Sequence, residues 1–159
     1  MILPEPNLSG DLSVEEALHR RRSIRKYEKR PLTVSEVSQL LWSAYGVTSP
    51  EGYRTAPSAM ALYPLEIDLV AGSVEGLNAG VYRYAPQNHE VRRTSGGDLR
   101  GKICETTFDQ PFVSEAAAVT VIYVLLVEVL IYREIPLIQL PRVIREAMVM
   151  VGAILVILG

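Results

Sequence analysis

The sequence has little cysteine and no excess of charge of one sign. Its single cysteine, Cys104, cannot form an internal disulfide, which is typical of proteins kept under reducing conditions. The 16 basic and 18 acidic residues leave a formal net charge of −2, so no overall field favours nucleic acid or an anionic membrane. The first six residues also lack the basic and then apolar pattern of a secretory signal. We therefore expect a cytoplasmic protein that does not bind nucleic acid.

The chain also lacks an uninterrupted apolar run of the length that a membrane helix needs. The most apolar stretches lie at 116–131, where only Glu128 is charged, and at 147–158, which carries no charge. Both fall short of the roughly 20 consecutive apolar residues that span a bilayer. These stretches therefore favour buried strands or helices over a membrane segment.

What the sequence does contain is a balanced globular composition and alternating helix and strand signals. Its 159 residues suit one domain, 1–159, with a single core. Ser13 and Thr33 each begin a Ser/Thr-x-x-Glu capping box, which predicts two amphipathic helices, the first with Val14, Ala17 and Leu18 on one face. Gly46 follows the second helix and predicts a left-handed stop.

Strand signals fill the second half of the chain. Residues 65–70 alternate apolar and acidic side chains, which predicts a half-buried strand with a solvated acidic face. Residues 81–84 and 90–93 read as two strands joined by a turn, and Asp98 precedes a short helix that runs to Cys104. Residues 119–130 are rich in β-branched side chains and predict a central strand buried on both faces. The fold class is therefore α+β.

Two segments carry residues suited to binding. The first is a cluster of basic side chains at 20–30, in which the guanidinium groups and a hydroxyl of Arg21, Arg22, Ser23 and Arg25 could grip a phosphate. The same cluster would also serve as a solvated basic face at a helix C-terminus. The second is the loop of small residues Pro57, Ser58 and Ala59, which would let main-chain amides approach a flat ring, or would simply be a tight connection.

Other reactive residue types offer weaker signals. His19 and His89 are far apart and lack the spacing of metal ligands, so we expect both at the surface and no metal site. Cys104 has no signalled base partner and reads as a small core residue. Tyr63, Tyr82 and Tyr84 could contact substrate, although strand aromatics more often pack in the core.

Taken together, several ordered motifs resemble the nitroreductase family, and most closely its SagB-like branch, which includes thiazoline and oxazoline dehydrogenases. The resemblance covers roughly residues 12–124. Its motifs are Arg-Arg-Ser-Ile-Arg-Lys-Tyr at 21–27, Leu-Leu-Trp-Ser-Ala-Tyr-Gly at 40–46, Arg-Thr-Ala-Pro-Ser-Ala at 54–59, Tyr-Pro-Leu-Glu at 63–66, Gly-Val-Tyr-Arg-Tyr at 80–84 and Asp-Gln-Pro-Phe-Val at 109–113.

The resemblance implies a nitroreductase-like α+β fold with a mixed or antiparallel sheet flanked by helices, and an FMN at the interface of an intertwined homodimer. It implies that Arg21, Ser23 and Arg25 hold the FMN phosphate and ribityl chain, and that Pro57, Ser58 and Ala59 border the isoalloxazine. The activity implied is an FMN-dependent oxidoreductase, which moves reducing equivalents from a donor such as NAD(P)H, or a peptide azoline, to a small-molecule acceptor. No catalytic acid or base is indicated.

The sequence departs from the family pattern after about residue 124. Residues 125–159 form a divergent apolar tail, without the later helix, turn and basic phosphate contact of that pattern. We therefore expect the C-terminal part to be atypical or truncated, as a frameshift would make it. The alternative to an enzyme is a noncatalytic or truncated nitroreductase-like remnant that acts as a partner-binding module.

Overall fold

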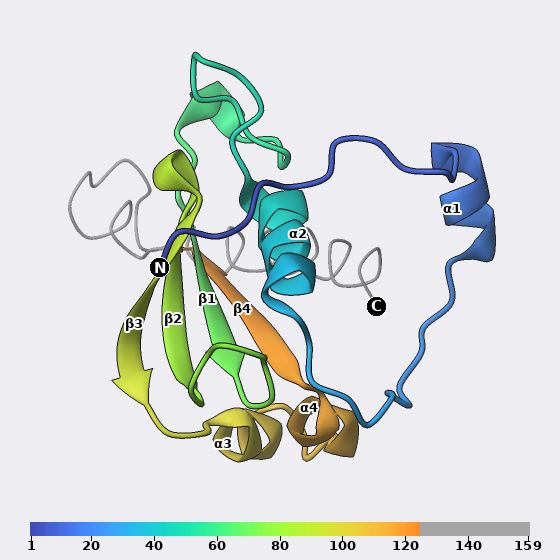
Figure 1. Cartoon of the computed structure of the whole chain (residues 1–159), viewed down its shortest axis with the longest axis vertical. Helices are drawn as coiled ribbons and strands as arrows, with labels where there is room; N and C mark the ends of the chain where they lie inside the picture. The colour runs from blue at the N-terminus through green and yellow to red at the C-terminus, as the bar shows by residue number, and fades with distance from the viewer. Residues whose placement is uncertain (125–159) are drawn as a thin grey trace, which may run out of the picture.

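The computed structural model describes residues 1–124, which are built around a four-stranded antiparallel sheet (Figure 1). The spatial order of the strands is β3-β2-β1-β4. Their bounds are β1 Leu65–Ala71, β2 Gly80–Ala85, β3 Glu90–Gly96 and β4 Ala118–Val124. The predicted α+β class, with an antiparallel sheet flanked by helices, is confirmed.

Helix α2 (Val34–Tyr45) covers one face of this sheet (Figure 1). Its predicted capping box forms in full, because the Thr33 hydroxyl accepts the Glu36 amide at 3.2 Å and the Glu36 carboxylate accepts the Thr33 amide at 2.8 Å. Helical spacing then aligns Val37, Leu41 and Tyr45, which are all buried in the core. Their partners in the same core cluster include Ile67, Leu69, Tyr82 and Val91 of the sheet.

Gly46 ends α2 by a mechanism that differs from the predicted one. Its φ of −68° and ψ of 153° are extended and not left-handed. A Cβ at Gly46 would collide with the Trp42 ring and would lie 2.7 Å from the Trp42 carbonyl oxygen. Glycine is therefore needed here because the chain turns back tightly over Trp42, and the prediction of a left-handed stop is wrong.

Strand β4 is also placed differently from the sequence expectation. Within residues 1–124 it pairs only with β1, so it is the edge strand of the described sheet, and its residues 118–121 are half-buried. The expectation of burial on both faces is wrong for residues 118–121. The remainder of that predicted strand, 125–130, and the apolar tail 125–159 lie outside the described residues.

The acidic face of β1 is ion-paired and not simply solvated. Arg83 on β2 stands opposite Asp68 in the antiparallel register, and its Nε donates to an Asp68 carboxylate oxygen at 2.5 Å. The guanidinium also pairs with Glu66 on the same strand. Only 15% of the Asp68 side chain is exposed. The two carboxylates therefore join neighbouring strands as well as facing water.

Two short helices, α3 (Arg100–Thr106) and α4 (Pro111–Glu115), lie at the end of the sheet where β4 begins (Figure 1). Asp98 accepts the Arg100 amide at 3.1 Å, as its predicted place before this helix suggested. Cys104 is half-buried and its thiol donates to the Gln110 carbonyl at 3.1 Å, so it is not the fully buried core residue that we expected.

Helix α1 (Val14–Arg20) stands away from the sheet on an extended arm (Figure 1). Ser13 caps it by accepting the Glu16 amide at 3.1 Å. None of its residues is buried, and Val14 and Leu18, on the predicted apolar face, are 72% and 62% exposed. The face therefore has no cover from the described part of its own chain. Among residues 1–124, no helix is long and apolar enough to cross a membrane.

The two histidines differ in their surroundings. His19 is exposed on α1, as expected. His89 instead is half-buried in the turn between β2 and β3, where it follows the short 3₁₀ helix η2 (Pro86–Asn88) with a φ of 46°. Its ring contacts Ser38 on α2 and Tyr84 on β2 through hydrogen bonds. The expectation of a surface residue is therefore wrong for His89, which joins two layers of the fold.

Candidate functional site

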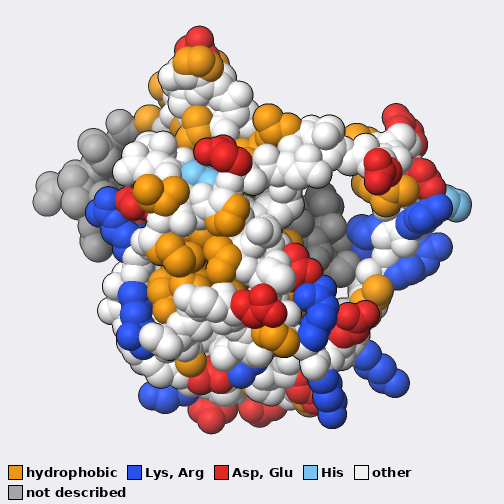
Figure 2. All heavy atoms as spheres, viewed as in Figure 1, with side chains coloured by type: hydrophobic (Ala, Val, Ile, Leu, Met, Phe, Trp, Pro, Cys, Tyr) orange, Lys and Arg blue, Asp and Glu red, His pale blue; other side chains and the backbone are white. Residues whose placement is uncertain are grey.

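The predicted phosphate-binding residues lie on an exposed segment without regular structure. Helix α1 ends at Arg20, and residues 21–28 form neither helix nor strand. Arg22, Ser23 and Arg25 are exposed, and Arg21 is half-buried. Figure 2 shows Lys and Arg side chains gathered along the arm that carries α1 and below it. The segment therefore presents cationic donors to a ligand or a partner.

Two of these arginines contact other parts of the chain. Arg22 donates to the carbonyls of His19 and Arg21, at 2.9 and 2.7 Å, so its guanidinium folds back over the end of α1. The guanidinium carbon of Arg25 lies 5.6 Å from the centre of the Phe112 ring on α4. This contact places Arg25 beside the end of the sheet at which β4 begins.

The predicted ring-facing loop, residues 56–63, has a bent and exposed backbone. It contains the single 3₁₀ turn η1 (Ala59–Ala61), in which Ala59 lies. Met60, Ala61 and Tyr63 have φ angles of 53°, 55° and 49°, the left-handed region that side chains with a Cβ rarely adopt. Pro57, Met60 and Ala61 are exposed, and Ser58 is half-buried. Backbone strain of this kind clusters at ligand-binding segments.

Hydrogen bonds and ring contacts hold the loop in this shape. Ser58 Oγ accepts the Tyr63 amide at 2.8 Å across the bend. Arg54, immediately before the loop, packs its guanidinium on the Tyr63 ring and on the Tyr45 ring of α2. Burial raises the pKa of Tyr45 above its ordinary value, and the hydrogen bond from the Leu65 amide and then the nearby Arg54 oppose that rise. Sequence reasoning assigned no role to Tyr45 or Arg54 beyond their places in the family motifs at 40–46 and 54–59.

The two predicted halves of the site lie at opposite ends of β1 within one chain. The loop 56–63 leads into Leu65, the first residue of β1. Arg25 instead packs on α4, just before Ala118, which pairs with Ala71 at the last position of β1. A strand of this length spans about 20 Å at about 3.3 Å per residue. One chain, as described, therefore does not bring the phosphate-binding segment and the ring-facing loop together.

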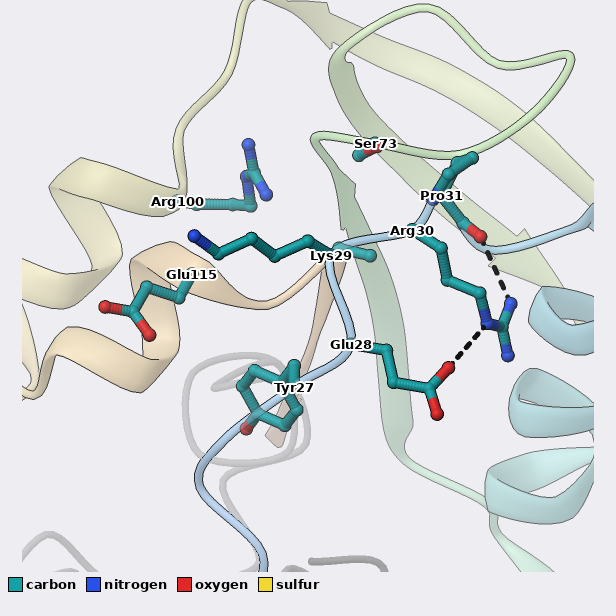
Figure 3. Close-up of a pocket in the computed structure, with 9 residues that line it drawn as sticks. Tyr27, Glu28, Lys29, Arg30, Pro31, Ser73, Arg100 and Glu115 are labelled. Carbon is teal, nitrogen blue, oxygen red and sulfur yellow. Dashed lines mark hydrogen bonds and ion pairs between the residues drawn. The ribbon is translucent and has the colours of Figure 1, made fainter.

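A pocket of about 620 Å³ lies near the basic segment, between residues 27–31, Ser73 and the start of α3 (Figure 3). Its charged lining residues are Glu28, Lys29, Arg30, Arg100 and Glu115. Arg30 pairs with Glu28 at 3.2 Å, and Lys29 extends toward Arg100 and Glu115. Acids thus accompany the cations around this pocket.

Arg100 contributes to this pocket mainly as a structural residue. It pairs with Asp98 at 2.6 Å and donates to the Ala116 carbonyl at 2.5 Å, which ties α3 to the start of β4. Gly72 lies so close that a Cβ there would overlap the guanidinium. The pocket also follows the end of β1, whereas the strained loop precedes its start. The pocket therefore lies at the same end of β1 as Arg25 and away from the loop 56–63, so it does not join the two predicted segments.

Comparison with known proteins identifies the class to which this fold and these segments belong. The sequence model of the Nitroreductase family matches residues 18–146. The chain is therefore a member of the nitroreductase family, as the motifs suggested. The matched region includes both candidate segments, and it continues beyond residue 124, where the motif resemblance ends.

Individual relatives agree with this assignment. A nitroreductase-family protein of Methanocaldococcus jannaschii, MJ1384, is 38% identical over 112 residues, which cover 70% of this chain and 57% of that protein. A nitroreductase-type structure from Ralstonia eutropha matches with a TM-score of 0.70 at 30% identity, over 86% of this chain and 60% of that one. One from Anabaena variabilis matches with a TM-score of 0.57 at 30% identity, over 68% of this chain and 23% of that one. The chain thus spans only part of the length of these relatives.

Proposed function

We propose that this protein is an FMN-dependent oxidoreductase of the nitroreductase type, which passes electrons from a donor such as NAD(P)H to a small acceptor. Family membership supports an oxidoreductase, and the motifs favour the SagB-like branch. The observation that carries the proposal is the loop 56–63, whose exposed backbone is held in a strained shape immediately before β1. We propose a cytoplasmic location, in keeping with the single cysteine.

The residues present fit the two ends of FMN. Arg21, Arg22, Ser23 and Arg25 would hold the phosphate and ribityl chain, because guanidinium and hydroxyl groups donate to phosphate oxygens and this segment is largely exposed. Pro57, Ser58 and Ala59 would border the isoalloxazine, since small residues allow close approach to a flat ring. When bound, FMN would supply the redox chemistry, and the protein would supply orientation and electrostatics.

We further propose that the site is completed in a homodimer, with the basic segment of one protomer facing the loop of its partner. Two observations support this arrangement. The segments are at opposite ends of β1 in one chain, and the apolar face of α1, with Val14 and Leu18, has no cover from residues 1–124. Exposed apolar helix faces of this kind usually bury themselves against a partner.

The test is to add FMN to the purified protein and to record the visible spectrum while titrating, together with the molar mass in solution. We expect a yellow complex with one FMN for each protomer, a dimer mass, and bleaching of the flavin band on addition of NADH or NADPH. A colourless protein that leaves the spectrum of added FMN unchanged would overturn the proposal. That result would instead favour the noncatalytic partner-binding module.

A further inference from the structure

Arg54 occupies an unusual position between two tyrosine rings. Its guanidinium carbon lies 4.2 Å from the centre of the Tyr45 ring and 4.9 Å from the centre of the Tyr63 ring. The ring centres are 6.2 Å apart and the ring planes meet at 74°. Both distances are within the roughly 6 Å at which a cation is attracted to an aromatic face. One cation therefore links the end of α2 to both ends of the loop 56–63.

Two main-chain hydrogen bonds to the tyrosine hydroxyls also connect these residues. The Arg54 amide donates to the Tyr63 hydroxyl at 3.3 Å, and the Leu65 amide donates to the Tyr45 hydroxyl at 3.1 Å. Arg54 precedes the loop, and Tyr63 and Leu65 follow its bend. These contacts therefore hold the entry and the exit of the loop together, and we call Arg54, Tyr45 and Tyr63 the loop clamp.

The loop needs such a clamp because its backbone is strained. Left-handed conformations at Met60, Ala61 and Tyr63 each cost on the order of 1 kcal/mol or more for a residue with a Cβ. Met60 is 90% exposed, so its own side chain adds little packing to offset that cost. Conformations of this kind persist only where the surrounding structure imposes them.

Arg54 is half-buried, and it contacts both the ring and the hydroxyl of Tyr45. Its Nε is buried and has no hydrogen-bond partner among the residues that the structure describes. A guanidinium removed from water gains more from an aromatic face than an exposed one does. Arginine is suited to this position because its charge is spread over a flat guanidinium wide enough to lie near both rings, whereas lysine carries a compact charge.

We infer that Arg54 is a positioning residue, which sets the shape of the loop 56–63 through Tyr45 and Tyr63 and thereby aims the main-chain amides of that loop at the flavin ring. This inference rests on the proposed function for its ligand, but the clamp can be tested without it. If the clamp loosens, the loop no longer holds one shape and binds the ring edge less well. Donors at the ring edge favour the reduced, more negative flavin, so a loosened loop also lowers its midpoint potential.

The experiment compares Arg54→Lys, Arg54→Met and Tyr63→Phe with the wild type, and uses Arg92→Ala as a control for loss of a surface cation on β3. Three quantities are measured: the Kd for FMN, the midpoint potential of the bound flavin, and the rate at which chymotrypsin cleaves the FMN-free protein at Met60 or Leu62. Leu62 is 61% exposed, so the folded loop is accessible to the protease. Tyr63→Phe keeps the ring contact and serves if the Arg54 variants fail to fold.

We expect Arg54→Met to raise the Kd for FMN about tenfold, to lower the midpoint potential and to speed cleavage in the loop. Arg54→Lys should recover part of each change, Tyr63→Phe should shift all three quantities in the same direction by less, and Arg92→Ala should change none. Wild-type values for all three quantities in folded Arg54→Met protein would overturn the inference. If the wild type itself binds no FMN, the proposed function fails; the clamp then stands or falls on the cleavage rates alone.

Discussion

Ser38 Oγ lies 2.6 Å from Nε2 of His89, and this contact joins the buried face of α2 to the turn between β2 and β3. The same hydroxyl donates to the Pro4 carbonyl at 2.5 Å, and the Tyr84 hydroxyl lies 2.8 Å from His89 Nδ1. The Ser38 hydroxyl, the Tyr84 hydroxyl and both ring nitrogens of His89 are all hydrogen-bonded if Tyr84 donates to Nδ1 and a protonated Nε2 donates to Ser38 Oγ. Burial raises the pKa of Tyr84 to about 12, so its hydroxyl stays protonated as a donor.

We predict that Ser38→Ala lowers the free energy of unfolding, because Ser38 is only 1% exposed and its loss removes a buried hydrogen-bonding partner from both Pro4 and His89. The expected cost is about 1 to 3 kcal/mol. Urea denaturation of Ser38→Ala should be compared with that of Ser35→Ala. Ser35 is exposed on the same helix, and the control makes the same change of serine to alanine. Equal stability of the two variants would contradict this role for Ser38.

A second prediction concerns the acid range. Hydrogen bonds from Arg30, and then from the Thr33 amide, lower the pKa of Glu36 from 4.5 to about 2. A carboxylate with a lowered folded pKa stabilises the protein fully above its unfolded pKa, and this contribution is lost as the pH falls from about 4.5 toward 2. Glu36→Gln keeps a side chain that can complete the capping box but removes the charge.

We therefore expect the wild type to be more stable than Glu36→Gln near neutral pH, and the two stabilities to converge as the pH approaches 2. Thermal unfolding between pH 2 and 7 measures this difference. Glu75→Gln, at an exposed carboxyl, serves as the charge-matched control. A constant offset between the wild type and Glu36→Gln over the whole range would show that the titration of Glu36 is not coupled to folding.

A third prediction concerns the strained loop. Met60 has a φ of 53° and is 90% exposed, so glycine at this position would relieve strain without removing core packing. We expect Met60→Gly to raise the free energy of unfolding by about 1 kcal/mol. Leu62→Gly should destabilise instead, because Leu62 is not left-handed and glycine there only adds freedom to the unfolded chain. Calorimetric unfolding of both variants measures whether each substitution raises or lowers the free energy of unfolding.

The fourth prediction tests the basic segment. Arg21→Ala should weaken FMN binding by about 2 kcal/mol, or about thirtyfold in Kd, if its guanidinium bonds to the phosphate. Riboflavin, which lacks the phosphate, should bind both forms with similar affinity. Arg92→Ala controls for the loss of one positive charge elsewhere. An unchanged Kd for FMN in Arg21→Ala would remove this residue from the proposed site.

Local signals were the part of the fold that could be predicted well. The hydroxyl caps at Ser13 and Thr33 form as expected because a cap depends on residues three positions apart. The alternation in residues 65–70 likewise appears as β1. His89 differs from its prediction because Ser38, 51 residues away in the chain, contacts its ring. Gly46 differs because the Trp42 side chain, one helical turn earlier, lies against it, and residue types alone do not show where that ring points.

The candidate site, like the fold, could be predicted from the sequence only in part. The types of residue that would serve a phosphate and a flat ring could be proposed from 21–25 and 57–59 alone. The clamp could not be recognised, because Tyr45 and Arg54 are separated along the chain and become neighbours only when α2 packs beside the loop. No spacing rule predicts such a contact.

The local elements and the residue types of the two candidate segments follow from the sequence alone, since capping, alternation and side-chain type act over a few residues. The tertiary structure decided where those segments lie. Pairing of β4 with β1 places Arg25 and the strained loop toward opposite ends of a strand that is about 20 Å long, because strand register fixes positions that are distant in the chain.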